Sequence, residues 1–307
     1  MQDSTTGDLL PPVPSEPMSI RSLLFVPADD QRKLARASGT EADAIAIDLE
    51  DSVLPERKAT ARGLTREHLL GASDRKRLWV RVNDLASGEL LHDLTAVVPA
   101  RPAGIILPKT RGPEEFEIVS RYLEALEAAS GLSAGAIAII GVITETPSAV
   151  LRMGEMIRRP TERLRAVAWG AEDLSSALGA GDPRTADGAW RPTYQHARSQ
   201  CILAAHALGV EAIDTVYVDF RDERGLHQSS QMSRYDGFTG RVAIHPDQVP
   251  IINSAFTPTA AEIALAERIV AAFAAGSGAV SIDGKMYDIP HLKNAQRLLS
   301  VRHTPGS

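Results

Sequence analysis

Residues 21–28 read RSLLFVPA, a short apolar run that ends at Pro27 and is followed by Ala28 and Asp29. A strand that opens a dinucleotide-binding sheet leads into the pattern G-x-G-x-x-G, which is absent here. The phosphate-binding pattern G-x-x-x-x-G-K-[S/T] occurs nowhere in the sequence. Both absences disfavour a nucleotide-binding open sheet and favour a closed barrel as the interpretation of this first strand.

Eight apolar runs of strand type alternate with segments of helical period. They are near-continuous instead of strictly alternating, which is typical of parallel strands that are buried on both faces. The runs are Ser22–Val26, Ala44–Leu49, Leu78–Val82, Gly104–Leu107, Ile137–Ile143, Arg165–Trp169, Ile213–Val218 and Val242–Ile244. The clearest helical segment starts at Pro113 and stops before Gly131. This order predicts an α/β fold, a (β/α)₈ TIM barrel over residues 19–255, although the pattern alone also fits an open sheet.

The two ends of the chain lie outside the predicted barrel. Residues 1–18 contain several prolines and no basic start with an apolar core, which predicts a disordered tail and no signal peptide. Residues 256–307 are expected to form C-terminal helices and a lid. Thr259 and Glu262 match a capping box, and a short helix is expected over His291–Leu299. The polar connection Asp283–Asp288 between these helices is the candidate lid.

The composition limits the kind of partner. Of the 307 residues, 44% are hydrophobic and 23% are charged, which is ordinary for a folded globular chain. The net charge of −6, without a dense basic stripe, argues against nucleic acid or an anionic membrane as a partner. The longest apolar run, Ala136–Ile143, is far shorter than the ~20 residues of a membrane span. Cys201 is the only cysteine, which excludes an intramolecular disulfide and fits a cytoplasmic location.

Charged residues gather where the predicted strands give way to loops, which in a β/α barrel is the end that carries catalysis. Glu145 follows the fifth run, and Asp173 follows the sixth. Together they would offer hard oxygen ligands to Mg²⁺ or Mn²⁺. From spacing alone, an equally good interpretation is that each carboxylate caps the helix that follows it.

Other strand ends carry groups that suit an anionic substrate. Arg81, in the third run, has the planar donor fork that binds a carboxylate through two hydrogen bonds. It could instead form a structural ion pair with Glu50 or Asp51, which follow the second run. His245, followed by Pro246, comes after the eighth run and is predicted to shape a pocket.

Eight stretches of the chain carry a further signal. They are RSLLFVPA (21–28), IDLEDSV (47–53), WVRVND (79–84), GIILPKT (104–110), ITETPSAV (143–150), AWGAEDL (168–174), GRVAIHPDQV (240–249) and DGKMYDIP (283–290). In this order they resemble the citrate lyase β-subunit-like proteins and the malyl-CoA and citramalyl-CoA lyases. The resemblance implies a β/α barrel, one Mg²⁺ ion and reversible carbon–carbon cleavage of a 3-hydroxyacyl thioester.

The resemblance also assigns roles by position. The metal ligands of the family fall on Glu145 and Asp173, and the arginine that binds the substrate carboxylate falls on Arg81. Glu50 and Asp51 are expected to anchor metal-bound waters or to orient that arginine.

Coenzyme A contacts are implied at three other places. They fall around Arg21, Pro27 and the His245–Pro246 turn, with Arg32 and Lys33 as phosphate partners. The chain departs from many relatives after Pro27, where alanine and two acids stand in place of glycine. Acids at this position oppose phosphate binding.

The expected products are acetyl-CoA and glyoxylate or pyruvate, from malyl-CoA or citramalyl-CoA. Asp288 falls on the acid that, in related lyases, reaches into the site of a neighbouring subunit, where it would protonate the enolate. This implies a homo-oligomer, a trimer or a hexamer. Alternatively, Asp288 is the N-cap of the final helix.

Three other functions stay open. Lys109, at the end of the fourth run, could be the Schiff-base nucleophile of a metal-independent aldolase. The chain could be a citrate lyase β subunit that depends on an acyl-carrier partner. It could also be a thioesterase that hydrolyses malyl-CoA or citramalyl-CoA.

Overall fold

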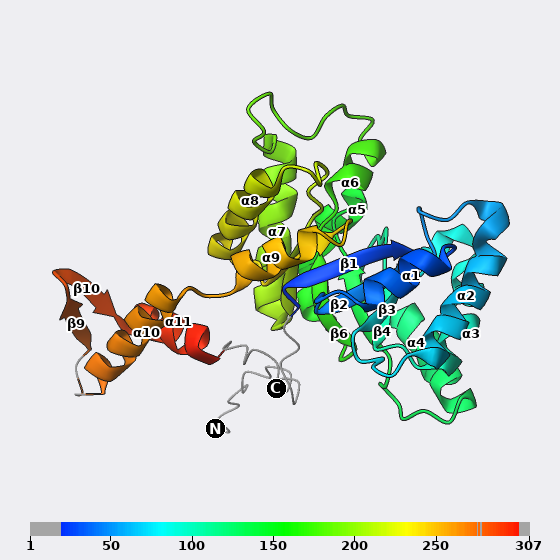
Figure 1. The fold of residues 1–307 in the computed structure, drawn as a ribbon, viewed down its shortest axis with the longest axis horizontal. Helices are drawn as coiled ribbons and strands as arrows, with labels where there is room; N and C mark the ends of the chain where they lie inside the picture. Colours follow the sequence, from blue (N-terminus) through cyan, green and yellow to red (C-terminus); the bar gives the residue numbers. More distant parts are fainter. Residues whose placement is uncertain (1–19, 275, 277, 301–307) are drawn as a thin grey trace, which may run out of the picture.

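The computed structural model describes residues 20–274, 276 and 278–300, so the predicted tail over residues 1–18 lies outside the described residues. Its main body is a closed barrel of eight parallel strands in sequence order (Figure 1). The first strand pairs with both the second and the eighth, which closes the sheet. The strands are β1 Ser22–Pro27, β2 Ala44–Asp48, β3 Leu78–Arg81, β4 Gly104–Leu107, β5 Ala138–Val142, β6 Leu164–Ala168, β7 Glu211–Asp214 and β8 Gly240–Ala243. The predicted (β/α)₈ fold is confirmed.

Helices between the strands form an outer ring around the barrel (Figure 1). They are α1 Gln31–Ser38, α2 Lys58–Gly71, α3 Leu90–Val97, α4 Pro113–Ala129, α5 Pro147–Arg158, α6 Ala171–Ala177, α7 Pro192–Leu208, α8 Glu223–Asp236 and α9 Gln248–Phe256. The helix predicted to start at Pro113 does so and ends at Ala129, as expected. Among the described elements, none combines the length and apolar character that a membrane crossing needs.

The seventh strand is the one whose predicted position was wrong. It was expected over Ile213–Val218, but it spans Glu211–Asp214. Glu211 belongs to the strand because it pairs with Ala166 of β6, and at the base of the barrel its carboxylate accepts the N–H of Ile20. Val218 is 63% exposed and lies in the loop after the strand. The apolar run therefore continues into a loop at the mouth.

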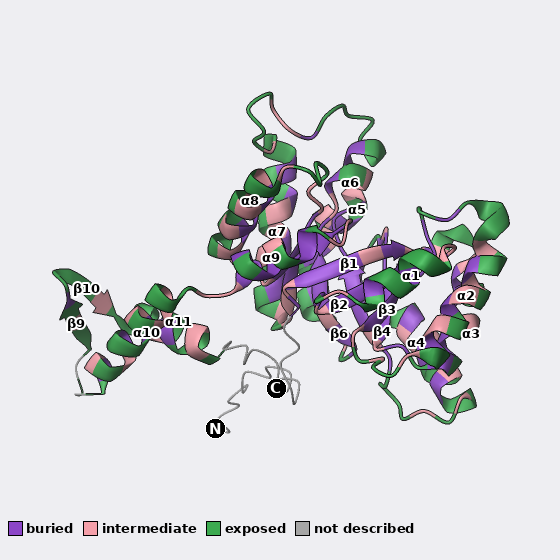
Figure 2. Ribbon diagram, viewed as in Figure 1, coloured by how far each residue is buried: buried purple, intermediate pink, exposed green. Residues whose placement is uncertain are grey.

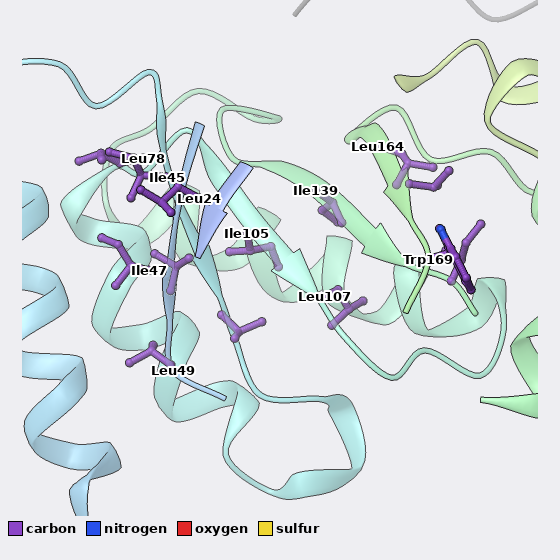
Figure 3. Packing of buried hydrophobic residues seen from close by; sticks show 14 of the residues in the cluster. Leu24, Ile45, Ile47, Leu49, Leu78, Ile105, Leu107, Ile139, Leu164 and Trp169 are labelled. Atoms are coloured by element: carbon purple, nitrogen blue, oxygen red, sulfur yellow. The ribbon is translucent and has the colours of Figure 1, made fainter. Parts of the chain in front are cut away.

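Side chains along each strand face the barrel interior and the helices in turn. Ala46 and Trp79 belong to the cluster inside the barrel. Ile47, which is labelled in Figure 3, belongs to the cluster between the strands and the helices. A Cβ at Gly104 would lie 2.2 Å from the Trp79 ring, so glycine leaves room for that large interior side chain. Figure 2 shows that the buried residues are concentrated in the strands and on the helix faces that pack against them. The same alternation turns Asp48, the last residue of β2, towards the interior at the mouth.

A small unit follows α9 and projects from the barrel (Figure 1). It consists of α10 Ala260–Phe273, the hairpin β9 Ala279–Ile282 and β10 Lys285–Asp288, and α11 Ile289–Ser300, with a small apolar core of its own. The capping box of Thr259 and Glu262 is present, and the last helix covers the predicted His291–Leu299. The hairpin was not predicted. Its turn residues Asp283 and Gly284 have φ of 51° and 76°, the two positive values that a type I′ hairpin turn needs.

The C-terminal unit is attached at the base of the barrel, the end opposite the mouth. Arg234 in the last turn of α8 pairs with Glu262 of α10 at 2.6 Å. His206 in the last turn of α7 lies 3.1 Å from the Arg297 guanidinium of α11. Because the helices of a β/α barrel run antiparallel to its strands, their last turns lie at the amino ends of the strands.

Candidate active site

The carboxyl ends of the strands enclose a cavity of about 300 Å³. Its deeper wall is apolar and includes side chains of β1, β4, β5 and β8. Its charged lining residues are Asp48, Arg81, Glu145, Glu172 and Asp173. A concave apolar pocket with a few converging polar groups is typical of a small-molecule site. The mouth of the barrel is therefore the candidate active site.

Arg81 is fixed at this mouth by two acids from the end of β2. Its Nε and Nη2 donate to the two oxygens of Asp48 at 2.7 and 2.6 Å, and its Nη1 lies 2.9 Å from Glu50. The predicted ion pair with Glu50 is therefore present, and the guanidinium also lies over the Phe25 ring. Burial disfavours the charge of Asp48, but the charge of Arg81 and the hydrogen bonds from Arg81, Ser52 and the Glu50 backbone together outweigh burial, so the pKa of Asp48 is lowered.

Glu145 and Asp173 both line the cavity, as expected for residues that follow β5 and β6. Glu145 is 5% exposed. Burial, and then the charge of Asp173, raise the pKa of Glu145 to about 8. The interpretation of these acids as helix caps is wrong. The N-cap of α5 is Thr146, and α6 has Gly170 at its N-cap with no side-chain cap.

The surroundings of this pair fit a divalent cation. Two neighbouring carboxylates are a suitable donor set for a hard cation that also takes water and substrate oxygens. Among residues 20–274, 276 and 278–300, no group of three or more His, Cys, Asp or Glu side chains is placed to hold a metal ion, and Glu145 and Asp173 are a candidate pair. Gly170 makes room for one of them, since a Cβ there would lie 2.8 Å from the Glu145 Cγ.

Lys109 lies between the two groups of acids. Its backbone N–H donates to Glu145 at 2.6 Å, and its Nζ lies 2.6 Å from Glu50, 2.8 Å from Asp51 and 3.5 Å from Asp173. Burial lowers the pKa of this amine, but hydrogen bonds to Asp51 and Glu50, together with the charges of Glu50 and Asp173, outweigh burial and raise it. A Schiff-base nucleophile must be a free amine, so this environment argues against that mechanism.

The other predicted substrate contacts fall into two groups. Pro27 lines the cavity, and His245 lies at the rim, where its ring stacks on Phe220 at 5.1 Å. Arg32 and Lys33 are exposed in the first turn of α1, and neither lines the cavity. Pro246 follows His245 in the loop between β8 and α9.

Arg21 and Asp288 are not brought to this cavity within one subunit. Arg21 precedes β1 at the base, where it binds the Asp43 carboxylate at 2.8 Å and Thr257 at 3.0 Å. The prediction that Arg21 contacts the thioester conflicts with this position, because the amino and carboxyl ends of a strand lie at opposite ends of the barrel. Asp288 ends β10 in the C-terminal unit, with its carboxylate 2.5 Å from His291 Nδ1.

Sequence reasoning missed two residues of the site. Asp48 lies within the predicted run Ala44–Leu49 and was given no role, yet its place two residues after Ala46 puts it on the interior face. Gly170 lies two residues after the end of β6 and leaves the space that Glu145 occupies. A glycine directly after the apolar run Arg165–Trp169 is a signal that could have identified it.

Comparisons with known proteins identify the family of the chain. The family described as HpcH/HpaI aldolase/citrate lyase matches residues 21–246. The mitochondrial citramalyl-CoA lyase of Rattus norvegicus is 33% identical to this chain, and the match covers 92% of this chain and 85% of the relative. A (3S)-malyl-CoA thioesterase of Cereibacter sphaeroides is 34% identical, and the match covers 91% of this chain and 93% of that relative. The structure of CitE from Mycobacterium tuberculosis with magnesium, acetoacetate and coenzyme A superposes with a TM-score of 0.78 at 31% identity, covering 92% of this chain and 97% of that one. The chain therefore belongs to the HpcH/HpaI aldolase/citrate lyase family.

Proposed function

We propose that this protein is a CoA-thioester-dependent carbon–carbon lyase. It cleaves a 3-hydroxyacyl-CoA such as malyl-CoA or citramalyl-CoA to acetyl-CoA and glyoxylate or pyruvate, and the reaction is reversible. The observation that carries the proposal is the single cavity in which Arg81 meets the carboxylates of Glu145 and Asp173. Relatives named citramalyl-CoA lyase, which align over 92% of the chain, support it.

Mg²⁺ is the expected cofactor, with Mn²⁺ as an alternative, and Glu145 and Asp173 would hold it. Solved CitE structures in complex with magnesium support this assignment. When bound, the ion would acidify the substrate hydroxyl and polarise the carboxylate next to it. The two protein carboxylates suit Mg²⁺, which is commonly held by one or two carboxylates and keeps several waters.

Arg81 would bind the carboxylate of the departing 2-oxo acid. Two of its five N–H donors bond Asp48, and its Nη1 forms an ion pair with Glu50 at 2.9 Å, which leaves further N–H donors for the substrate. Because both partner acids are buried, the guanidinium keeps one orientation and needs no reorganisation when substrate arrives. Asp48 and Glu50 are thus positioning residues in this proposal, and Asp51, which is half exposed, pairs with Lys109 at the rim.

The general acid in this proposal is Asp288 of a neighbouring copy. In its own subunit, Asp288 belongs to the unit attached at the base, whereas the cavity opens at the other end. The hydrogen bond from His291 lowers the pKa of Asp288, so the free subunit carries a carboxylate there. A carboxylate is the form that removes a proton from acetyl-CoA in the condensation direction. The functional unit would be a homo-oligomer, a trimer or a hexamer.

The alternatives differ in their products. Hydrolysis of the thioester is a second candidate, because a relative named (3S)-malyl-CoA thioesterase is 34% identical over 91% of the chain. It would release free malate or citramalate without a 2-oxo acid. A β subunit that requires an acyl carrier, suggested by relatives named citrate lyase subunit beta-like protein, would ignore free CoA thioesters. The cytoplasmic location stays a prediction from composition.

The decisive experiment is a condensation assay of the purified protein. Acetyl-CoA or propionyl-CoA is offered with glyoxylate or pyruvate and Mg²⁺, and products are identified by mass spectrometry. We expect a metal-dependent hydroxyacyl-CoA product that disappears with EDTA and in Asp173→Ala. A protein that forms no such product, but hydrolyses malyl-CoA, would be a thioesterase.

A further inference from the structure

Lys109 has an unusual backbone conformation for a residue with a side chain. Its φ is +50°, in the left-handed region that is unfavourable for L-residues other than glycine. The surrounding contacts maintain this conformation. The backbone N–H donates to Glu145 at 2.6 Å, while the side chain of the same residue turns towards the acids on the other side of the mouth.

The ammonium of Lys109 already compensates charge in the mouth. It lies 2.6 Å from Glu50, 2.8 Å from Asp51 and 3.5 Å from Asp173. Arg81, the other cation here, is paired with Asp48 as well as Glu50. Among the described residues, the ion pairs of the mouth make Lys109 the cation nearest to Asp173.

A fixed ammonium at this distance from Asp173 opposes a second cation on the same carboxylate. The repulsion is appreciable because the Lys109 side chain is mostly shielded from water, so solvent screens it weakly. An anionic 2-oxo acid that enters the mouth adds negative charge and offsets this repulsion. Binding of the anion and of a divalent cation then favour each other, and thermodynamic linkage makes the effect equal in both directions.

We propose that Lys109 is an internal counter-ion that keeps metal affinity low in the free site and makes metal binding depend on the arrival of the anionic substrate. This inference rests on the proposed function, because it concerns the cation held by Glu145 and Asp173. It assigns to Lys109 a role as a positioning and coupling residue, in place of the nucleophile considered from the sequence. The substrate class that it implies is a small 2-oxo carboxylate bound together with a divalent cation.

The test is a titration with Mn²⁺, followed by the electron paramagnetic resonance signal of the free ion, with and without pyruvate or glyoxylate. The variants are Lys109→Met, which keeps the side-chain length and backbone strain but removes the charge, and Lys109→Arg, which keeps the charge. Lys109→Gln is a second neutral variant in case Lys109→Met does not fold, as judged by circular dichroism.

We expect wild-type protein and Lys109→Arg to bind Mn²⁺ weakly alone and at least about tenfold more tightly with the oxo acid. A neutral variant should bind Mn²⁺ alone at least about tenfold more tightly than wild type and gain less from the oxo acid. The inference is overturned if a folded neutral variant binds Mn²⁺ alone no more tightly than wild type does. If wild type binds no Mn²⁺ under either condition, the metal-dependent function itself is wrong.

Discussion

The buried carboxyl group of Glu145 makes folding stability depend on pH. The pKa of Glu145 is raised from 4.5 to about 8, first by burial and then by Asp173. A carboxyl group with a higher pKa in the folded state stabilises that state while it is protonated. This contribution is fully present below pH 4.5 and is lost as the pH rises through 8. At ~1.4 kcal/mol per pKa unit, Glu145 lowers the free energy of unfolding by up to about 4 kcal/mol between pH 5 and 8.

The measurement is urea unfolding of metal-free protein, followed by circular dichroism across this pH range, for wild type and Glu145→Gln. Glutamine keeps the shape of the side chain but cannot ionise, so the variant should lose this share of the pH dependence. Glu211 provides a matched control, because burial raises its pKa to about 7 at the base of the barrel, away from Asp173. Glu211→Gln should remove a separate part of the pH dependence of the free energy of unfolding.

Saturating Mg²⁺ should restore stability at pH 8 in wild type and in Glu211→Gln, because a metal ion stabilises the ionised form of Glu145. It should have little effect in Glu145→Gln. The reasoning is refuted if Glu145→Gln keeps the full wild-type pH dependence, or if Mg²⁺ stabilises that variant as much as it stabilises wild type.

Asp48→Asn should raise the KM for the 2-oxo acid and lower kcat by at least about tenfold in steady-state assays, because Arg81 loses a charged partner that orients it. An unchanged KM and kcat would contradict the proposal that Asp48 positions Arg81. Gly170→Ala should fold but bind Mn²⁺ at least about tenfold more weakly, since the added Cβ displaces Glu145; unaltered affinity in the Mn²⁺ titration would show that this side chain can shift without loss. Asp288→Asn and Glu145→Gln should each be inactive alone, and dissociation and reassembly of the two together should restore part of the activity; no recovery in mixed oligomers would mean that the acid does not act between subunits.

The sequence was sufficient for the order of the barrel strands because a strand buried on both faces needs a continuous apolar run. It also indicated that Glu145 and Asp173 lie at the mouth, since both come within five residues of the carboxyl ends of β5 and β6. It failed for β7, where Val216 and Val218 extend the apolar run into the loop at the mouth. An apolar residue can belong to a buried strand or to the wall of a pocket, and the sequence alone does not distinguish the two.

Contacts between residues that are far apart in the sequence were harder to predict. Arg21 was assigned to the substrate because it stands beside the first strand, but its partners Asp43 and Thr257 are at the base. Which end of a strand a flanking residue occupies follows from chain direction, and applying that rule would have corrected the assignment. The hairpin around Asp283 was regarded as a loop, although Asp-Gly is a strong hairpin signal.

The pairing of β1 with β8 has a consequence for synthesis of the protein. Ser22 and Leu24 of the first strand pair with Arg241 and Ala243, so the sheet cannot close until the ribosome has released nearly the whole barrel sequence. Both strands also line the cavity. Nascent chains that stop short of β8 therefore hold an open sheet edge, a target for chaperones, and no substrate pocket. Catalytic competence arises in one late step of maturation.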